Sequence, residues 1–386
     1  MDANTLALMA QGFGNALDPM NLLMMAIGVT IGVIVGCMPG LSAAMGVALL
    51  LPLTFGMKAE TGLIMLGGIY CGAIFGGSIC AILIHTPGTP ASAATALDGY
   101  ELTKQGRAGK ALGIACTASF FGGLLSCISL YFFAPLLAEL AMKFGSPEYF
   151  WLALFGLTII AGFLGYNTAK QFSKTPEKFG HGSIEGVAGS EAANNAVTGG
   201  SLIPTLTLGI PGESVTAVLM GGLIIQSLQP GPELFTKYAP MTYTFFAGFV
   251  IVQFFMLLIG LGGCRIFAHI AKISDAILIP CIFVLCVVGS FAINNSFVDV
   301  VLMFIFGVMG YLMRKMGLNT AAVVLALILG PIGERGLRRS LTLSGNDISI
   351  LFSTPICWGL IILCVLSAFS PLLMDWLKKG KAAIKG

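Results

Sequence analysis

The sequence predicts an all-α membrane protein that crosses the bilayer several times. Hydrophobic residues make up 56% of the 386 residues and charged residues only 10%, whereas soluble domains carry about 25% charged residues. Apolar runs close to the length of about 20 residues that a helix needs to cross a bilayer recur along the chain. The alternating pattern of a closed β-barrel is missing. A net charge of +3 without a basic, aromatic-rich patch argues against a nucleic-acid partner.

Eight apolar runs are candidate membrane spans. They cover residues 20–38, 62–86, 111–133, 150–165, 241–264, 276–295, 297–313 and 350–374. Four further apolar stretches are too short or too broken for simple spans, at 41–55, 201–212, 215–229 and 318–331. The basic clusters do not fix one orientation, because they cannot all face the cytoplasm if 318–331 is re-entrant and 350–374 is a span.

Polar loops and broken segments divide the chain into two membrane halves. The first half covers residues 1–165, with broken segments at 39–55 and 78–99. A polar loop is expected at 166–198. The second half covers residues 199–386, with a broken segment at 201–229.

The two halves share a motif, which predicts an inverted repeat. Gly76-Gly77-Ser78 precedes Pro87-Gly88, and Gly199-Gly200-Ser201 precedes Pro211-Gly212 at nearly the same spacing. A small-residue segment follows each Pro-Gly. Matched interruptions in two halves are typical of the binding site of a secondary transporter. We expect helical hairpins or discontinuous helices here, with tips that approach each other near the middle of the membrane.

The chemistry of a Pro-Gly break supports this interpretation. Proline removes a backbone donor and glycine accepts unusual dihedral angles, so the helix stops and frees N–H and C=O groups. Such groups cannot face lipid and must line a cavity. A new helix N-terminus there can bind an anion, and carbonyls and hydroxyls can bind Na⁺. The alternative is that Pro-Gly marks kinks or surface turns of a duplicated scaffold.

Candidate substrate and ion ligands follow from their position beside the breaks. They are Gly40, Ser42, Gly88, Thr89, Ser92, Asn194, Asn195, Ser201, Thr207, Gly212, Glu213 and Ser214. A Na⁺ site is expected near Thr207, Gly209 and Glu213. The alternatives are hydroxyls bonded to their own helix backbone, asparagines that cap helices, and a Glu213 that lies in water at a hairpin tip.

No enzyme signature is present. Gly109-Lys110 is followed by Ala111 and lacks the upstream glycine of a Walker A motif, and neither GxSxG nor HExxH occurs. No cysteine–histidine cluster has metal spacing. We therefore expect no enzymatic activity and no cofactor apart from a coupling ion, Na⁺ or H⁺. An ion channel is the alternative function, because broken helices also build selectivity filters.

At these motifs the sequence resembles the large membrane subunit of the tripartite tricarboxylate transporters. The strings that carry the resemblance cover nearly the whole chain. They are Met38–Ala44, Leu51–Gly56, Gly68–Ser78, Pro87–Ala93, Glu191–Ala196, Leu206–Gly212, Leu228–Pro232, Leu329–Pro331, Leu337–Leu341 and Ser344-Gly345.

The resemblance implies a cation-coupled symporter subunit in a bacterial inner membrane. Its substrates would be citrate and related di- and tricarboxylates. Its partners would be a small four-helix membrane subunit and a periplasmic solute-binding protein. A homo-oligomer is left open.

Two departures from the family pattern stand out. Family members carry an extra hydrophobic block between the counterparts of Gly156–Ile160 and Glu185–Val187, whereas Phe163-Leu164-Gly165 here runs straight into Tyr166. A chain that lacks this block is either a carrier or a truncated, transport-inactive scaffold. The second departure is Glu213, where a small residue is the common pattern.

Overall fold

Helices form most of the described chain. The computed structural model describes residues 3–38, 41–87, 92–158, 164–270, 275–294, 296–316 and 320–366, and these ranges contain no β-strand. The predicted all-α fold is therefore confirmed.

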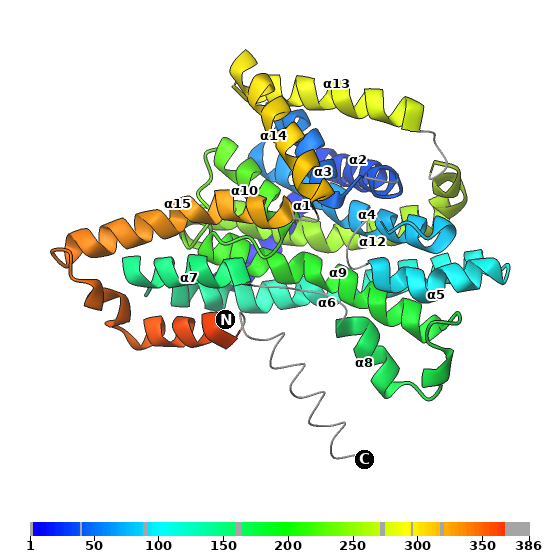
Figure 1. Cartoon of the computed structure of the whole chain (residues 1–386), viewed down its shortest axis with the longest axis horizontal. Coiled ribbons are helices and arrows are strands. Elements are labelled where there is room, and N and C mark those ends of the chain that lie inside the picture. Colours follow the sequence, from blue (N-terminus) through cyan, green and yellow to red (C-terminus); the bar gives the residue numbers. More distant parts are fainter. Residues whose placement is uncertain are drawn as a thin grey trace.

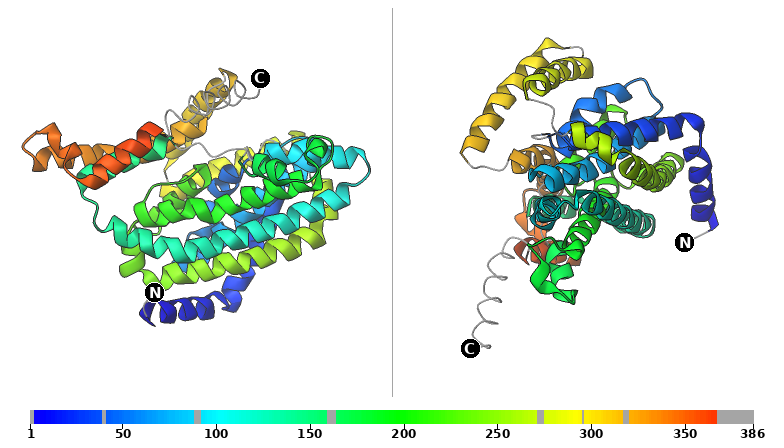
Figure 2. Two further views of the ribbon diagram at one scale, coloured as in Figure 1. Left: turned by 90° about the horizontal axis from the view of Figure 1, so that it is seen from below. Right: turned by 90° about the vertical axis from the view of Figure 1, so that its right-hand side faces the viewer.

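A bundle of long helices lies at the centre of the molecule (Figures 1 and 2). Its members are α2 (Pro19–Gly36), α4 (Ala59–Ile84), α6 (Ala108–Ala141), α9 (Ile184–Leu208) and α12 (Ala239–Ile270). Among the described residues, α2, α4, α6 and the Ala239–Gly263 part of α12 are long and apolar enough to cross a membrane. Since 89% of the most apolar stretch of α4 is buried, α4 is the core around which the other helices pack.

Glycines bring α2 and α4 into close contact. A Cβ added at Gly28, Gly32 or Gly36 would lie 2.5, 2.4 or 2.2 Å from a carbonyl oxygen of α4. In the opposite direction, Cβ atoms at Gly72 and Gly76 would each lie 2.5 Å from a carbonyl oxygen of α2. Glycines four residues apart therefore line both faces of this contact, as in closely packed membrane helices.

Short helices surround the bundle. They are α1 (Ala3–Ala16), α3 (Ala43–Leu50) with the 3₁₀ turn η1 (Leu51–Thr54), α5 (Ser92–Lys104), α8 (Leu164–Phe172), the turn η2 (Pro176–Lys178), α10 (Ser214–Ile225) and α11 (Glu233–Thr236). α1 lies along α12, and α3 and α10 pack on each other and on α4. Both α3 and α10 follow a Pro-Gly pair.

The remaining helices extend away from the bundle. α7 (Ser146–Thr158), α15 (Thr320–Leu343), the turn η3 (Ile348–Phe352) and a helix at Pro355–Leu366 form one extension. α13 (Asp275–Asn294) and α14 (Phe297–Lys315) form another, drawn in yellow and light orange in Figure 1.

Two sequence expectations are wrong. Residues 184–198, expected in a polar loop, form the first part of α9, because their polar face is buried against α5 and α6. Residues 320–331, expected in a broken segment, belong to the unbroken helix α15. Pro331 does not end this helix, and its carbonyl accepts a 3.1 Å hydrogen bond from Arg335 Nε. Of the predicted span 350–374, the part beyond residue 366 lies outside the described residues.

Candidate functional site

The two matched helices, α4 and α9, end with the same backbone geometry. α4 is capped by His85 at φ +57° and α9 by Gly209 at φ +68°. In each cap, two successive N–H groups donate to one carbonyl, that of Cys80 in α4 and that of Pro204 in α9. This is the left-handed cap that commonly ends helices. The predicted discontinuous helices are therefore present at both positions.

The two breaks differ in burial. His85 and Pro87 are exposed, whereas Pro211 is buried. Residues 88–91 lie outside the described residues, so the predicted approach of the two tips stays a prediction. The helix after the first break nevertheless returns to the bundle interior, since Ser92 at the start of α5 is fully buried.

Buried polar side chains form a row along α9. Its members, the α9 row, are spaced by one, three or four residues and all are less than 7% exposed: Ser190, Glu191, Asn194, Asn195, Thr198, Ser201 and Thr205. This spacing places them on one face of a helix. At about 1.5 Å per residue the row extends for roughly 22 Å. The hydroxyls of Ser190, Thr198, Ser201 and Thr205 donate to carbonyls of their own helix, so the row is a buried polar stripe within the bundle.

The second helix break lies at the Ser201 end of the row. The hydroxyl of Tyr70 on α4 lies 3.0 Å from Ser201 Oγ and donates to a carboxylate oxygen of Glu213. The N–H of Glu213 donates to Thr216 Oγ1 at 3.1 Å, which closes the N-terminus of α10. A Cβ at Gly212 would lie 2.8 Å from Ser201 Cα. The break is therefore packed directly against the α9 row.

Glu191 lies at the other end of the row. One carboxylate oxygen accepts a hydrogen bond from Thr95 on α5, and the other accepts one from Ser119 on α6 at 3.1 Å. Asn195 Nδ2 donates to Ser119 Oγ at 2.8 Å. Thr95 Oγ1 also lies 2.9 Å from Ser190 Oγ. Hydroxyls of α5 and α6 thus donate to one buried carboxylate of α9, and the Asn195 amide donates to one of these hydroxyls.

Two amide oxygens near the row have no hydrogen-bond partner. They are Asn195 Oδ1 and Gln253 Oε1, both on fully buried side chains. Gln253, on α12, lies against α6, where a Cβ at Gly123 would be 2.2 Å from its Oε1. A buried polar atom without a partner is costly, so such atoms are candidate ligands for a bound ion or solute.

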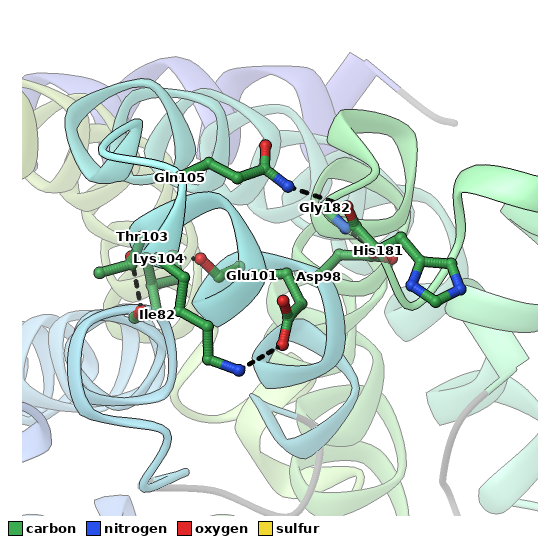
Figure 3. A network of polar contacts seen from close by, with 9 residues as sticks. Ile82, Asp98, Glu101, Thr103, Lys104, Gln105, His181 and Gly182 are labelled. Carbon is green, nitrogen blue, oxygen red and sulfur yellow. Dashed lines mark hydrogen bonds and ion pairs between the residues drawn. The ribbon is translucent and has the colours of Figure 1, made fainter.

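Backbone and side-chain hydrogen bonds fix the position of α5. Asp98 Oδ1 accepts from the N–H groups of Gly180, Gly182 and Ser183, at 2.7 to 3.0 Å, immediately before α9 begins. Figure 3 shows this corner, where Thr103 Oγ1 donates to the Ile82 carbonyl. These contacts tie α5 to both matched helices and so place Thr95 beside Glu191.

Ion pairs of the surface lie outside the row. The ammonium of Lys104 lies 2.7 Å from a carboxylate oxygen of Glu101 and lowers the pKa of that carboxyl group (Figure 3). The other ion pair among the described residues joins Arg338 and Glu334. Neither Glu191 nor Glu213 therefore has a basic partner in the described part of the chain.

Ten of the twelve predicted site residues divide into three groups. The structure brings Asn194, Asn195, Ser201, Gly212 and Glu213 together on or beside the α9 row. Ser92 begins α5 and Ser214 begins α10, at the two helices that follow the breaks. Gly40, Gly88 and Thr89 lie outside the described residues.

Three predicted hydroxyls have structural partners, and one of them, Ser201, donates to the Thr198 carbonyl at 3.2 Å. Ser42 caps α3 by accepting from the N–H of Met45 at 3.2 Å, and Thr207 donates to the Ile203 carbonyl at 2.7 Å. The described contacts of Glu213 run to Tyr70 and Thr216 rather than to Thr207 or Gly209. The Na⁺ site expected near Thr207, Gly209 and Glu213 stays a prediction.

Sequence reasoning missed five residues of the site. Glu191 belongs to the α9 row itself. Tyr70, Thr95 and Ser119 contact the row from α4, α5 and α6, and Gln253 on α12 donates to Cys71 of α4. Glu191 had a signal in the sequence, because polar residues recur at helical spacing from Ser190 to Thr205. The other four are single polar residues in apolar segments, with no pattern that marks them.

One cavity lies apart from this site. It measures ≈ 770 Å³ and is lined by residues between Gly14 and Met24 and between Gly56 and Thr61, among them Asp18, Lys58 and Glu60. No residue of α9 or α10 lines it. Its charged lining is net acidic, which does not favour an anionic ligand.

The fold and the α9 row define a multi-pass membrane protein with discontinuous helices and a buried polar interior. The model of the "Tripartite tricarboxylate transporter TctA family" matches residues 22–164 and 159–325. The chain belongs to this family of transporters.

Two relatives come from Agrobacterium vitis. An "Uncharacterized 52.8 kDa protein in TAR-I ttuC' 3'region" is 31% identical over 478 aligned positions, which cover 93% of this chain and 95% of that protein. An "Uncharacterized protein in TAR-II ttuC' 3'region" is 35% identical over 216 positions, which cover 55% of this chain and 89% of that protein. No solved structure matches the chain.

The comparisons also locate a missing block. The two segments that match the family meet at residues 159–164. The 478 aligned positions of the first relative exceed the 386 residues of this chain by 92, so at least that many positions have no counterpart here. The junction of the two family segments falls at the sequence departure noted between Gly156–Ile160 and Glu185–Val187.

Proposed function

We propose that this protein is the large membrane subunit of a cation-coupled transporter that carries citrate-like di- and tricarboxylates. The observation that carries the proposal is the α9 row, which runs through the bundle interior beside the N-terminus of α10. Hydroxyls, amides and a helix N-terminus are groups that bind carboxylates. Membership of the family supports the same substrate class.

Coupling to Na⁺ or H⁺ follows from charge. A di- or tricarboxylate that enters against a negative-inside potential costs about 2.3 kcal/mol per charge per 100 mV. Cotransported cations offset this cost. Inside the protein, the carboxylates of Glu191 and Glu213 can balance the charge of these cations. We expect uptake to follow the cation gradient and to ignore ATP.

The proposed partners are a small four-helix membrane subunit and a periplasmic solute-binding protein, in a bacterial inner membrane. The family is named for its tripartite systems, which supports this assembly.

A second candidate function is a transport-inactive scaffold. The aligned positions of the Agrobacterium vitis protein that have no counterpart here favour it, because a chain that lacks a hydrophobic block can also lack part of a permeation path. In a scaffold the Tyr70–Glu213 contact would permanently close the second break.

Uptake of labelled citrate into proteoliposomes, with the partner proteins and an imposed Na⁺ gradient, separates these functions. A carrier accumulates citrate only while the gradient lasts. A scaffold accumulates none, and an ion channel passes ions without citrate. Uptake that persists after the Na⁺ and H⁺ gradients are collapsed would contradict cation coupling.

A further inference from the structure

The carboxyl group of Glu191 is fully buried inside the bundle. The side chain has no exposed surface, and the helices that enclose it are α5, α6 and α9. The ion pairs among the described residues do not include it. An isolated carboxylate in this surrounding is costly unless a proton neutralises it or a cation pairs with it.

The groups around Glu191 offer oxygen ligands, which are the ligands that hard cations prefer. Thr95 Oγ1 donates a hydrogen bond to one carboxylate oxygen and Ser119 Oγ donates one to the other. Both hydroxyls belong to fully buried side chains. No sulfur or imidazole group is among the described hydrogen-bond partners of these side chains.

Asn195 supplies an independent observation that points to a ligand. Its Oδ1 is buried and unpartnered, while its Nδ2 lies 2.8 Å from Ser119 Oγ in the same cluster. A half-turn of the amide brings Oδ1 to the place of Nδ2 and exchanges the two hydrogen bonds of Nδ2, to Ser119 Oγ and to the Glu191 carbonyl, for contacts of Oδ1. A cation between Glu191 and Asn195 would give this oxygen its missing partner.

We propose that Glu191, Thr95, Ser119 and Asn195 form a binding site for one cotransported Na⁺ ion. One carboxylate balances one positive charge, so a monovalent cation leaves the cluster neutral, whereas a divalent cation would leave a net charge inside the bundle. That the ion is cotransported rests on the proposed function. The binding of Na⁺ to these residues does not require uptake.

The site is distinct from the one that the sequence predicts near Glu213. Ten residues of α9, about 15 Å along the helix axis, separate Glu191 from Ser201, which lies beside the second break. Two separate carboxylates suit a substrate with several negative charges, because each can accompany one cation.

Equilibrium binding of ²²Na⁺ to the purified full-length chain in detergent tests the proposal. We expect saturable binding to the wild type and loss of one binding step in Glu191→Gln. Ser119→Ala removes only a hydroxyl, and we expect it to weaken that step by about 10- to 100-fold, the range for groups that orient a metal ligand. Glu185→Gln is the matched control, since Glu185 is an exposed glutamate of the same helix, and it should bind like the wild type.

Hydrogen exchange localises the effect. Na⁺, compared with choline, should slow amide exchange in peptides covering 184–198 of the wild type and of Glu185→Gln, but not of Glu191→Gln. The proposal is overturned if the wild type binds no Na⁺, or if Glu191→Gln and Ser119→Ala bind Na⁺ and slow exchange like the wild type. Na⁺ binding without citrate uptake would support this site while contradicting the transport function. Citrate uptake that depends on H⁺, in a protein that binds no Na⁺, would support the transport function and contradict this Na⁺ site.

Discussion

The hydroxyl of Tyr70 on α4 donates a hydrogen bond to the carboxylate of Glu213, at the start of α10. The same hydroxyl lies 3.0 Å from Ser201 Oγ on α9. One side chain of the first matched helix therefore links the helices on both sides of the second break. This contact joins the two halves that the sequence repeat predicts.

Tyr70→Phe should destabilise the protein by about 1 to 3 kcal/mol, because it leaves a carboxylate without its donor. Thermal unfolding in detergent measures the loss. Tyr311→Phe is the matched control, since the Tyr311 side chain is 65% exposed. Equal melting temperatures for the two variants would show that the Tyr70 contact contributes nothing.

Glu213→Gln should fold and should change the dependence of citrate uptake on Na⁺ or pH. The reason is that a carboxylate at the start of α10 competes with an anionic substrate for the same N–H groups, unless a cation neutralises it. Uptake rates across a range of Na⁺ concentration and pH measure the effect. Higher uptake than the wild type would identify Glu213 as a plug. Normal rates with unchanged cation dependence would refute a role in coupling.

Gly209→Ala should destabilise the protein by about 1 kcal/mol, because Gly209 caps α9 at φ +68°, where a Cβ is unfavourable. The added Cβ would also lie 3.2 Å from the Pro230 carbonyl oxygen. Gly221→Ala on α10 is the control, since its Cβ meets nothing within 4 Å. A lower melting temperature for the control than for Gly209→Ala would contradict the cap.

Gly32→Ala should separate α2 from α4 and destabilise the fold by about 1 to 3 kcal/mol. The Cβ would lie 2.4 Å from the Ile69 carbonyl oxygen, and neither backbone can yield easily. Gly113→Ala on α6 has open space around it and should be neutral or stabilising. Thermal unfolding of both variants measures the difference in stability. A melting temperature of Gly32→Ala equal to that of the wild type would argue against close packing of α2 on α4.

The sequence carried enough information for the fold class and the helix breaks. Long apolar runs predict α2, α4, α6 and α12, and the matched Pro-Gly pairs predict where α4 and α9 end. These features depend on local composition and on proline and glycine, whose effects act within a few residues.

Long-range contacts explain what the sequence could not predict. The first part of α9 contains many polar and small residues and reads as a loop, although its polar face is buried against hydroxyls of α5 and α6. Tyr70 and Ser119 are isolated in apolar helices, so only tertiary packing shows that they meet Ser201 and Glu191.

If the solute passes along the α9 row, Asn194→Leu should block its transport. Asn194 is 4% exposed and lies between Glu191 and Ser201 on the row. The measurement is the initial rate of Na⁺-gradient-driven citrate uptake into proteoliposomes, with Thr117→Val, an exposed polar residue of α6, as the control. We expect the wild type and Thr117→Val to accumulate citrate at equal rates, and folded Asn194→Leu to lose uptake at least about tenfold, a difference of about 1.4 kcal/mol. Wild-type rates in Asn194→Leu, or no uptake by the wild type with its partners present, would contradict this expectation.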